Sequence, residues 1–217
     1  MPETDLVPLQ RPLVMLFRKD YRIGKRVFDL LVCLILLPFI LVIGLAIAAL
    51  IYITDPGPIF FRQYRTGKGG KRFAMYKFRT MVTNAEELKQ KYAHLNELTW
   101  PDFKITDDPR VTRIGRFLRK TSLDELPQVI NVFKGEMSLV GPRPTSFDVS
   151  TYSLWHTERL EVTPGITGLW QVSGRSDLDF DERLRLDIEY IERQSLWFDV
   201  EILFRTLTVP FTQHGAY

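Results

Sequence analysis

Residues 30–53, LLVCLILLPFILVIGLAIAALIYI, form a run of 24 uncharged residues, of which 22 are apolar. As a helix, this run would be about 36 Å long, which is enough to cross a hydrocarbon core of about 30 Å. It is too long and too far from the N-terminus for an ordinary secretory signal peptide, and no small-residue cleavage site follows it. The sequence therefore predicts one membrane element.

Positive charge flanks this run on both sides. Residues 11–29 contain six basic residues against two acidic ones, and residues 54–85 contain seven against one. A helix that crosses once is expected to have its excess of lysine and arginine on the cytoplasmic side only. Pro38 lies inside the run, and a proline there removes a backbone hydrogen bond and kinks a helix. These features favour a re-entrant hairpin with both ends at the cytoplasmic face, and a kinked spanning helix is the alternative.

Outside this run the chain has the composition of a soluble domain. Its 217 residues carry 29 lysines and arginines against 26 acidic residues, which gives a net charge of +3. With 45% hydrophobic and 25% charged residues, the chain is neither a disordered tail nor a collagen nor a polytopic membrane protein. The single cysteine, Cys33, excludes an intramolecular disulfide, and nothing indicates an oxidising compartment.

Short periodic segments make up this remainder. Residues 59–66 and 72–78 are rich in aromatic residues and are separated by glycine and lysine, which predicts a β-hairpin. Helical patterns occur in four segments, residues 84–98, 109–120, 123–133 and 180–193. Prolines and glycines at 141–144 and 164–168 predict two rigid loops. The mixture predicts an α+β fold that is mostly helical.

The two ends of the chain differ in character. Residues 1–20 contain three prolines and little periodicity, which predicts a mobile arm. Residues 196–211 have apolar side chains near helical spacing, with aromatic residues beside them. Such an amphipathic helix lies either in a membrane interface or against the core of the soluble domain, and both interpretations stay open.

Residues 119–127, RKTSLDELP, place two adjacent carboxylates, Asp124 and Glu125, after two cations. A structural interpretation is that Ser122 and Glu125 form a capping box, in a first turn that suits acidic residues. Pro127 argues against it, because a helix that starts at 123 or 124 would place this proline in its first turn, where proline is tolerated. Asp124 then needs another role, and catalysis is the alternative.

Cations in rigid segments favour a phosphate site. Arg143 lies between two prolines and Arg175 follows a glycine, and arginines held in this way suit bidentate recognition of phosphate. Solvated turn residues would give the same pattern. Lys77 and Arg79 close the hairpin, so the cations together suit a diphosphate, with a carboxylate and Mg²⁺ at the reacting phosphorus. An aspartate can itself attack phosphorus and form a phospho-enzyme.

Five motifs occur in order along the chain: KRxFD at 25–29, YKFRTM at 76–81, SLDELPQ at 122–128, NV followed by GEMSLVGPRP at 131–144, and PGITG followed by QVSGR at 164–175. Together they closely resemble the bacterial sugar transferase family, the monotopic phosphoglycosyl transferases that act on undecaprenyl phosphate. The resemblance covers residues 21–217, about nine tenths of the chain. No motif of a P-loop, a dinucleotide fold or a nucleophile elbow is present.

The resemblance implies that a UDP-sugar gives its sugar-1-phosphate to undecaprenyl phosphate. UDP-galactose and UDP-glucose are the favoured donors, and a related transferase that uses an N-acetylated sugar or a different acceptor is the alternative within this class. The products are undecaprenyl-diphosphate-sugar and UMP, and this step initiates an exopolysaccharide, O-antigen or capsule repeat. By motif match, Asp124 is the nucleophile of a covalent aspartyl-phosphosugar intermediate and a Mg²⁺ ligand, and Glu125 completes the dyad. The residues assigned to phosphate or nucleotide are Lys77, Arg79, Arg119, Arg143 and Arg175, and Asp187 matches a further acidic position.

The resemblance also implies a compact catalytic domain at the cytoplasmic face of the bacterial inner membrane, with interfacial helices and a re-entrant helix broken at Pro38. The expected division is a mobile arm over 1–20, the re-entrant membrane helix over 21–54 and the catalytic domain over 55–217. The expected partners are the UDP-sugar, undecaprenyl phosphate and membrane phospholipids, and a homodimer is left open.

The chain departs from the family pattern in two ways. Leu37 precedes Pro38 where many members have serine, and the segments that precede the catalytic part of longer members are missing, which suggests a short member or an excised portion. The alternative function is a membrane-anchored binding or scaffold protein without catalysis. Nucleic acid is not an expected partner, because the basic residues are interleaved with proline and glycine loops and do not follow one helix.

Overall fold

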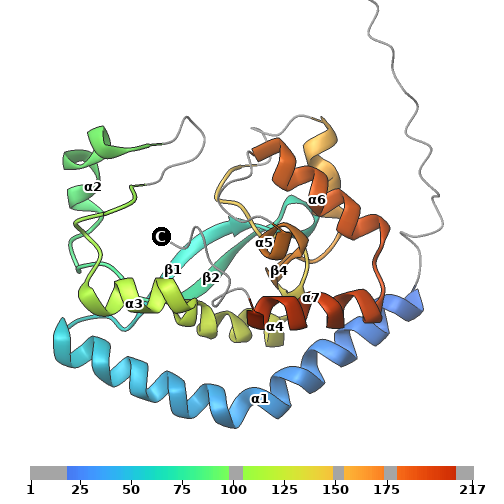
Figure 1. Cartoon of the computed structure of the whole chain (residues 1–217), viewed down its shortest axis with the longest axis horizontal. Helices are drawn as coiled ribbons and strands as arrows, with labels where there is room; N and C mark the ends of the chain where they lie inside the picture. Colours follow the sequence, from blue (N-terminus) through green and yellow to red (C-terminus); the bar gives the residue numbers. More distant parts are fainter. Residues whose placement is uncertain (1–18, 98–104, 149–153, 174–179, 209–217) are drawn as a thin grey trace, which may run out of the picture.

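The computed structural model describes residues 19–97, 105–148, 154–173 and 180–208. Within these ranges the chain is mostly helical, with two small sheets above one long helix at the base (Figure 1). This agrees with the predicted α+β fold. The predicted mobile arm lies outside the described residues, except for positions 19 and 20, which already belong to the long helix.

Helix α1 spans Lys19–Thr54 and forms the base of the molecule (Figure 1). It is bent near its middle, and Pro38 lies inside it. A proline at this position cannot donate to the carbonyl four residues earlier and its ring clashes with that carbonyl, which explains the bend. Among the described residues, α1 is the one helix that is long and apolar enough to cross a membrane, judged by length and composition.

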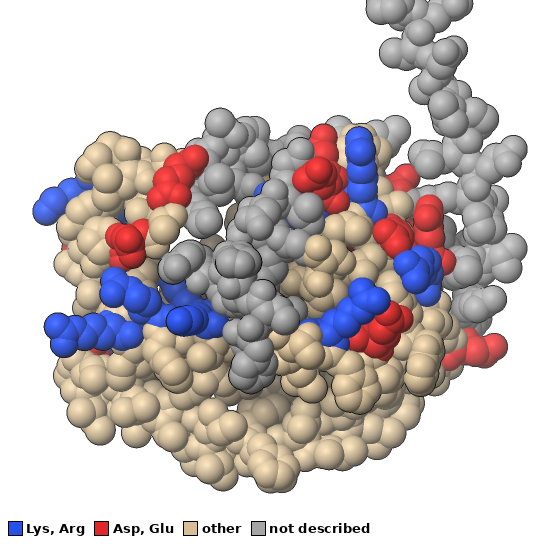
Figure 2. All heavy atoms as spheres, in the orientation of Figure 1, with Lys and Arg blue, Asp and Glu red and all other residues tan. Residues whose placement is uncertain are grey.

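One side of α1 packs against the body of the protein, and the rest of its surface is exposed. Cys33, Ile47 and Ile51 are buried, but only 11% of the most apolar window of the helix is buried. In the lower part of Figure 2, where α1 lies, the described residues show a mostly uncharged surface with acidic side chains at its right-hand edge, and lysine and arginine side chains lie above it. An exposed apolar surface of this extent marks an interaction site.

The predicted β-hairpin is confirmed. Strands β1 (Phe60–Thr66) and β2 (Arg72–Phe78) pair antiparallel, with Phe60 opposite Phe78. The turn between them contains η1 (Lys68–Gly70), in which Gly69 has a φ of +63° that favours glycine. The hairpin buries Phe73, Met75 and Phe78 of β2 against η3, α4 and the second half of α1.

A second, parallel sheet was not predicted. Strand β3 (Ser138–Val140) pairs with β4 (Gly165–Thr167), and the predicted rigid loops at 141–144 and 164–168 flank or overlap these strands. The backbones come so close that a Cβ on Gly165 would lie 2.1 Å from the amide nitrogen of Gly141. Because each strand has only three residues, the sequence contains no alternating pattern that would predict this sheet.

Two predicted helical segments, 109–120 and 180–193, are confirmed as one helix each, with shifted boundaries. The described part of residues 84–98 contains only a five-residue α-helix and a short 3₁₀ turn, and residues 123–133 are a 3₁₀ helix followed by an α-helix. The remaining helices are α2 (Glu87–Lys91), η2 (Ala93–Leu95), α3 (Arg113–Thr121), η3 (Leu123–Gln128), α4 (Val129–Lys134), η5 (Leu154–Glu161), α5 (Leu169–Ser173), α6 (Phe180–Glu192) and α7 (Leu196–Thr208). For helix α7 the interpretation as a core-packing helix is confirmed, and the interfacial interpretation stays a prediction. Phe198 and Ile202 are buried in the core, whereas Trp197, Phe204 and Leu207 are exposed on other sides of the helix.

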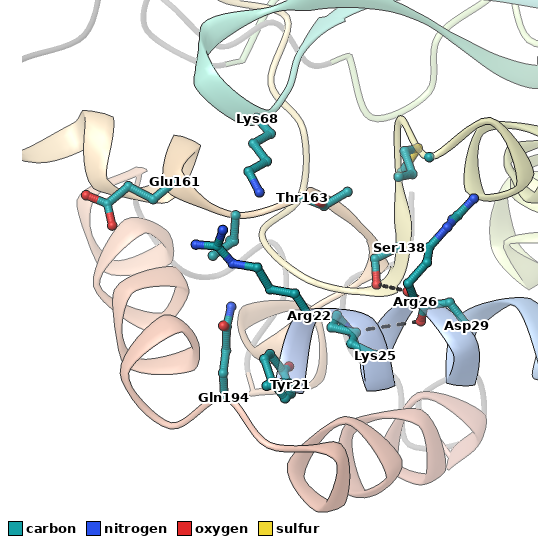
Figure 3. Close-up of a pocket in the computed structure, with 13 residues that line it drawn as sticks. Tyr21, Arg22, Lys25, Arg26, Asp29, Lys68, Ser138, Glu161, Thr163 and Gln194 are labelled. Atoms are coloured by element: carbon teal, nitrogen blue, oxygen red, sulfur yellow. Dashed lines mark hydrogen bonds and ion pairs between the residues drawn. The ribbon is translucent and has the colours of Figure 1, made fainter. Parts of the chain in front are cut away.

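The first half of α1 is tied to the body by a buried polar network. The Nζ of Lys25 lies 2.8 Å from Oδ2 of Asp199 in α7 and 3.9 Å from Oδ1 of Asp29. The hydroxyl of Tyr190 donates to Asp199 at 2.7 Å, and the hydroxyl of Ser138 donates to Asp29 at 2.7 Å. Figure 3 shows Lys25 and Ser138 converging on Asp29. Because these charges are buried and mutually satisfied, the network specifies where α1 docks.

A second tie lies one residue further along α1. The guanidinium of Arg26 donates to the carbonyls of Val132 and Phe133 in the last turn of α4. The carbonyl of Val132 also accepts from the backbone N–H of Gly135, the residue that caps α4, and a cation at a helix C-terminus complements the helix dipole. Lys25 and Arg26 thus hold the same turn of α1 against α7 and α4.

We predict that Asp199→Asn lowers the free energy of unfolding by about 2 kcal/mol, because it leaves the buried Lys25 ammonium with only the more distant Asp29. This corresponds to a Tm lower by about 4–8 °C, measured by tryptophan fluorescence of the detergent-solubilised chain. The control is Glu201→Gln in the same helix, whose exposed pair with Arg205 should change the free energy by less than about 0.5 kcal/mol. Equal effects of the two changes would contradict the network.

Candidate active site

The candidate site is built around the junction between α3 and η3. Ser122, between these helices, has φ 58° and ψ 16°, a left-handed conformation that is uncommon for a residue other than glycine. Its side chain makes no cap hydrogen bond, so the capping-box interpretation is wrong. The 3₁₀ helix begins at Leu123, and the left-handed turn sets the direction in which Asp124 and Glu125 leave the backbone. Backbone strain of this kind is concentrated at functional sites.

Three segments distant in sequence bring the predicted charges together. Lys77 comes from β2, Asp124 and Glu125 from η3, and Arg143 from the loop after β3. The Nζ of Lys77 lies 2.8 Å from Oε1 of Glu125 and 3.9 Å from Oδ2 of Asp124. Arg143 binds both carboxylate oxygens of Glu125, with Nη1 at 3.1 Å from Oε2 and Nη2 on Oε1. Glu125 is therefore held by two cations, while Asp124 has one at longer range.

This arrangement pushes the pKa values of the two carboxyl groups apart. Burial raises the pKa of Asp124, and Lys77 only partly offsets this effect. Burial acts in the same direction on Glu125, but Arg143 and Lys77 outweigh it and hold the pKa of Glu125 well below its usual range. Neighbouring acids with opposite shifts are typical of sites that use them for different tasks.

Arg119 and Arg79 occupy two different positions beside this cluster. The Nε of Arg119, in α3, donates to the hydroxyl of Thr80 at 3.0 Å. Burial lowers the pKa of Arg119, and attraction to Asp124 opposes the shift. Arg79 instead pairs with Asp55, directly after α1, with Nη1 at 2.9 Å from Oδ2. Arg79 joins the end of the hairpin to the end of α1, and its role in phosphate binding stays a prediction. The role of Arg175 also stays a prediction, because this residue lies outside the described residues.

Asp187 reaches the cluster through a residue that the sequence analysis missed. Its Oδ2 lies 2.7 Å from Nη2 of the buried Arg159, and the same Nη2 donates to the backbone carbonyl of Arg143. Burial raises the pKa of Asp187 to about 6, although Arg159 opposes the shift. Asp187 therefore stabilises the loop that contains Arg143 indirectly, through Arg159. No motif or spacing in the sequence marks Arg159.

A cavity of about 130 Å³ adjoins Arg143 on the side of α6. Among the described residues that line it, the charged ones are all arginines, Arg65, Arg143, Arg159 and Arg183, and the aromatic ones include Trp170 and Phe180. The guanidinium of Arg183 lies 5.7 Å from the centre of the Trp170 ring, which is the geometry of a cation–π contact. This arginine pocket suits a ligand that combines phosphate groups with a flat ring.

Mg²⁺ fits the site when a substrate shares it. Among the residues that the structure describes, no group of three or more histidine, cysteine, aspartate or glutamate residues is placed to hold a metal. Mg²⁺, however, is commonly bound by one or two carboxylates together with substrate phosphates and water. Asp124 supplies one such carboxylate, whereas both oxygens of Glu125 already accept from cations.

Comparisons with known proteins agree with the motifs. The family described as bacterial sugar transferase matches residues 20–213. The galactosyl transferase CpsE of Streptococcus agalactiae is 47% identical over 184 residues, which are 81% of this chain and 41% of that protein. The undecaprenyl-phosphate galactose phosphotransferase of Salmonella typhimurium is 45% identical over 212 residues, 93% and 43% of the two chains.

A shorter relative is similar over most of its own length. The exopolysaccharide production protein ExoY of Rhizobium meliloti is 38% identical over 199 residues, which are 89% of this chain and 88% of ExoY. By contrast, the chain spans about two fifths of the length of the two longer relatives. The shared part is thus the part that contains the cluster of Lys77, Asp124, Glu125 and Arg143.

We predict opposite stability changes for the two carboxylates. Glu125→Gln should lower the free energy of unfolding by about 2 kcal/mol at pH 7, because it breaks a buried pair. Since the folded pKa of Glu125 is lowered, this loss should shrink as the pH falls below about 4. The folded pKa of Asp124 is raised, so its ionised carboxylate destabilises the folded state at pH 7. Asp124→Asn removes this carboxylate and should therefore raise the Tm at pH 7. At low pH, where Asp124 is protonated, this gain in Tm should vanish.

Thermal unfolding of both variants between about pH 3 and pH 8 tests this pair of signs and their pH dependence. Asp107→Asn, an exposed change nearby, is the matched control and should leave the Tm unchanged. Destabilisation of the same size in both carboxylate variants would show that Asp124 is merely a second structural charge.

Proposed function

Because the chain belongs to the bacterial sugar transferase family, we propose that it transfers a sugar-1-phosphate from a UDP-sugar to undecaprenyl phosphate and releases UMP. The observation that carries this proposal is the buried Asp124 beside a glutamate already neutralised by Lys77 and Arg143. UDP-galactose and UDP-glucose are the proposed donors, since relatives named for galactose and for glucose transfer to undecaprenyl phosphate match 93% and 90% of the chain. The product would begin an exopolysaccharide or related repeat.

In the first step, a carboxylate oxygen of Asp124 attacks the phosphorus that bears the sugar. The new bond joins Asp124 to that phosphorus, and the bond to the bridging oxygen breaks, so UMP leaves with the electron pair. In the second step, an oxygen of undecaprenyl phosphate attacks the same phosphorus and the carboxylate of Asp124 leaves. Two attacks at one phosphorus let a single buried carboxylate serve a soluble donor and a lipid acceptor in turn.

The surrounding charges have separate tasks in this scheme. An anionic nucleophile and an anionic diphosphate repel each other, so cations fixed in advance lower the barrier. Lys77 lies close enough to both carboxylates to favour the ionised form of Asp124. Glu125 holds Lys77 and Arg143 in place, and Asp187 steadies the Arg143 loop through Arg159.

Magnesium is a proposed cofactor of the same site. When bound, Mg²⁺ neutralises diphosphate charge. Asp124 would hold it together with the donor's phosphate oxygens, because Glu125 is already occupied by cations. The arginine pocket beside Arg143 is the proposed place for the nucleotide, with phosphates toward the guanidinium groups and the ring toward Trp170.

The proposed location is the cytoplasmic face of the bacterial inner membrane, with α1 as a re-entrant helix. The bend at Pro38, the exposed apolar surface of α1 and the positive charge on both sides of its apolar run support this placement. Trp197, Phe204 and Leu207 of α7 would lie in the interface, where aromatic side chains are favoured. A site held there can meet one substrate in water and the other in the bilayer.

The nucleophile assignment predicts that Asp124→Asn abolishes UMP release from UDP-galactose or UDP-glucose in vesicles containing undecaprenyl phosphate and Mg²⁺. An amide oxygen is a far weaker nucleophile than a carboxylate, so the loss should reach at least about 10³-fold. Asp107→Asn is the control and should keep wild-type turnover. Normal turnover of Asp124→Asn would overturn the assignment, and no UMP release by the wild-type chain with any UDP-sugar would overturn the function.

The membrane placement predicts that spin labels at positions 197, 204 and 207 of α7 report an interfacial environment in vesicles. Their accessibility to oxygen should exceed that of a label at exposed position 89 in α2, which should be fully aqueous. If the oxygen accessibility at all three α7 positions equals that of the aqueous label at position 89, the interfacial placement of this helix is wrong.

A further inference from the structure

A mostly apolar cavity lies between the bent part of α1 and the catalytic carboxylates. Its volume is about 260 Å³, and its lining includes Cys33, Leu36 and Ile40 of α1 and Glu125 of η3. The rest of the lining includes residues of β3, β4, α5 and α7, half of them aliphatic (Leu139, Ile166 and Val172) and half polar (Thr167, Gln171 and Thr206). The cavity thus reaches from α1 to Glu125.

The side of this cavity at α1 is continuous with the apolar surface of the protein. Leu36 lines the cavity, yet 45% of its side chain is exposed. Leu36 and Ile40 lie on either side of Pro38, so the cavity meets α1 at its bend. An apolar chain can therefore pass from the exposed face of α1 into the cavity without crossing charged groups of the lining.

The other end of the cavity reaches the same ion pair as the arginine pocket, from another side. Glu125 lines the apolar cavity, and Arg143, which binds Glu125, lines the arginine pocket. The two compartments differ in chemistry, because one is lined by arginines and the other mainly by aliphatic side chains. A reaction in which a charged donor and a lipid acceptor meet one nucleophile requires two entrances of this kind.

We propose that this cavity binds the isoprene units next to the phosphate of the polyprenyl phosphate acceptor, with Leu36 and Ile40 as the residues that admit and orient the chain. The proposal rests on the proposed function. The aliphatic part of the lining matches a branched apolar tail along α1, and the anionic head group would be attracted by Lys77 and Arg143, the two cations that bind Glu125. The lipid phosphate oxygen then bonds to the phosphorus held on Asp124, and the bond between that phosphorus and Asp124 breaks.

The test separates the two half-reactions. Leu36→Trp and Ile40→Trp narrow the cavity, so each should raise the KM for undecaprenyl phosphate at least about tenfold. The burst of UMP released from the donor without acceptor should stay at the wild-type size, because the arginine pocket is untouched. The matched control is Val42→Trp, on the exposed surface of α1, which should leave both measurements unchanged.

The outcomes distinguish this inference from the proposed function. A normal burst with an unchanged acceptor KM in both tryptophan variants overturns the acceptor cavity alone. Absence of any burst in the wild-type chain overturns the proposed function instead.

A second measurement does not depend on the folding of variants. The wild-type chain in nanodiscs is illuminated with a photoreactive farnesyl phosphate, and the labelled peptides are identified by mass spectrometry. Labelling within residues 33–40, suppressed by undecaprenyl phosphate but not by phosphatidylglycerol, is expected. Labelling confined to the exposed positions of α1, or equal suppression by both lipids, would show that the probe only reports the bilayer.

Discussion

The two cations on Glu125 are the interaction on which the site depends. Two adjacent carboxylates in a largely buried position repel each other and lose hydration, so both cannot remain anionic without compensation. Lys77 and Arg143 bind Glu125 directly, whereas the cations around Asp124 offset its burial only in part. The fold brings these groups together from three segments. Strand β2 carries Lys77, the loop after β3 carries Arg143, and the left-handed conformation of Ser122 sets the direction of the two acids.

Helix α1 fixes the position of this site relative to the apolar surface of the protein. Lys25 and Arg26 fasten one turn of α1 to α7 and α4, while Arg79 and Asp55 fasten the region where α1 ends to the hairpin that contains Lys77. The helix is thus held on both sides of its bend at Pro38. A rigid base of this kind keeps the dyad at a constant position above an apolar surface, which a reaction between a soluble and a lipid substrate requires.

The sequence predicted the elements with strong local signals, namely the hairpin, α6 and the apolar run of α1. It could not predict β3 and β4, because three-residue strands have no readable period and form only through a long-range pairing. Ser122 and Glu125 have the spacing of a capping box, but Glu125 bonds instead with residues 18 and 48 positions away. Nothing in the sequence marks Asp199 as a buried residue, yet it is fully buried against Lys25.

The central claim is that Asp124 becomes covalently bonded to the sugar-phosphate, and intact mass spectrometry tests it most directly. The wild-type chain is mixed with UDP-galactose or UDP-glucose and Mg²⁺, without acceptor, and quenched within seconds. The account predicts a mass increase equal to one hexose phosphate, mapped to the peptide that contains Asp124 and lost when undecaprenyl phosphate is added. Product formation with no such adduct at any quench time would show direct transfer from donor to lipid and would contradict the account.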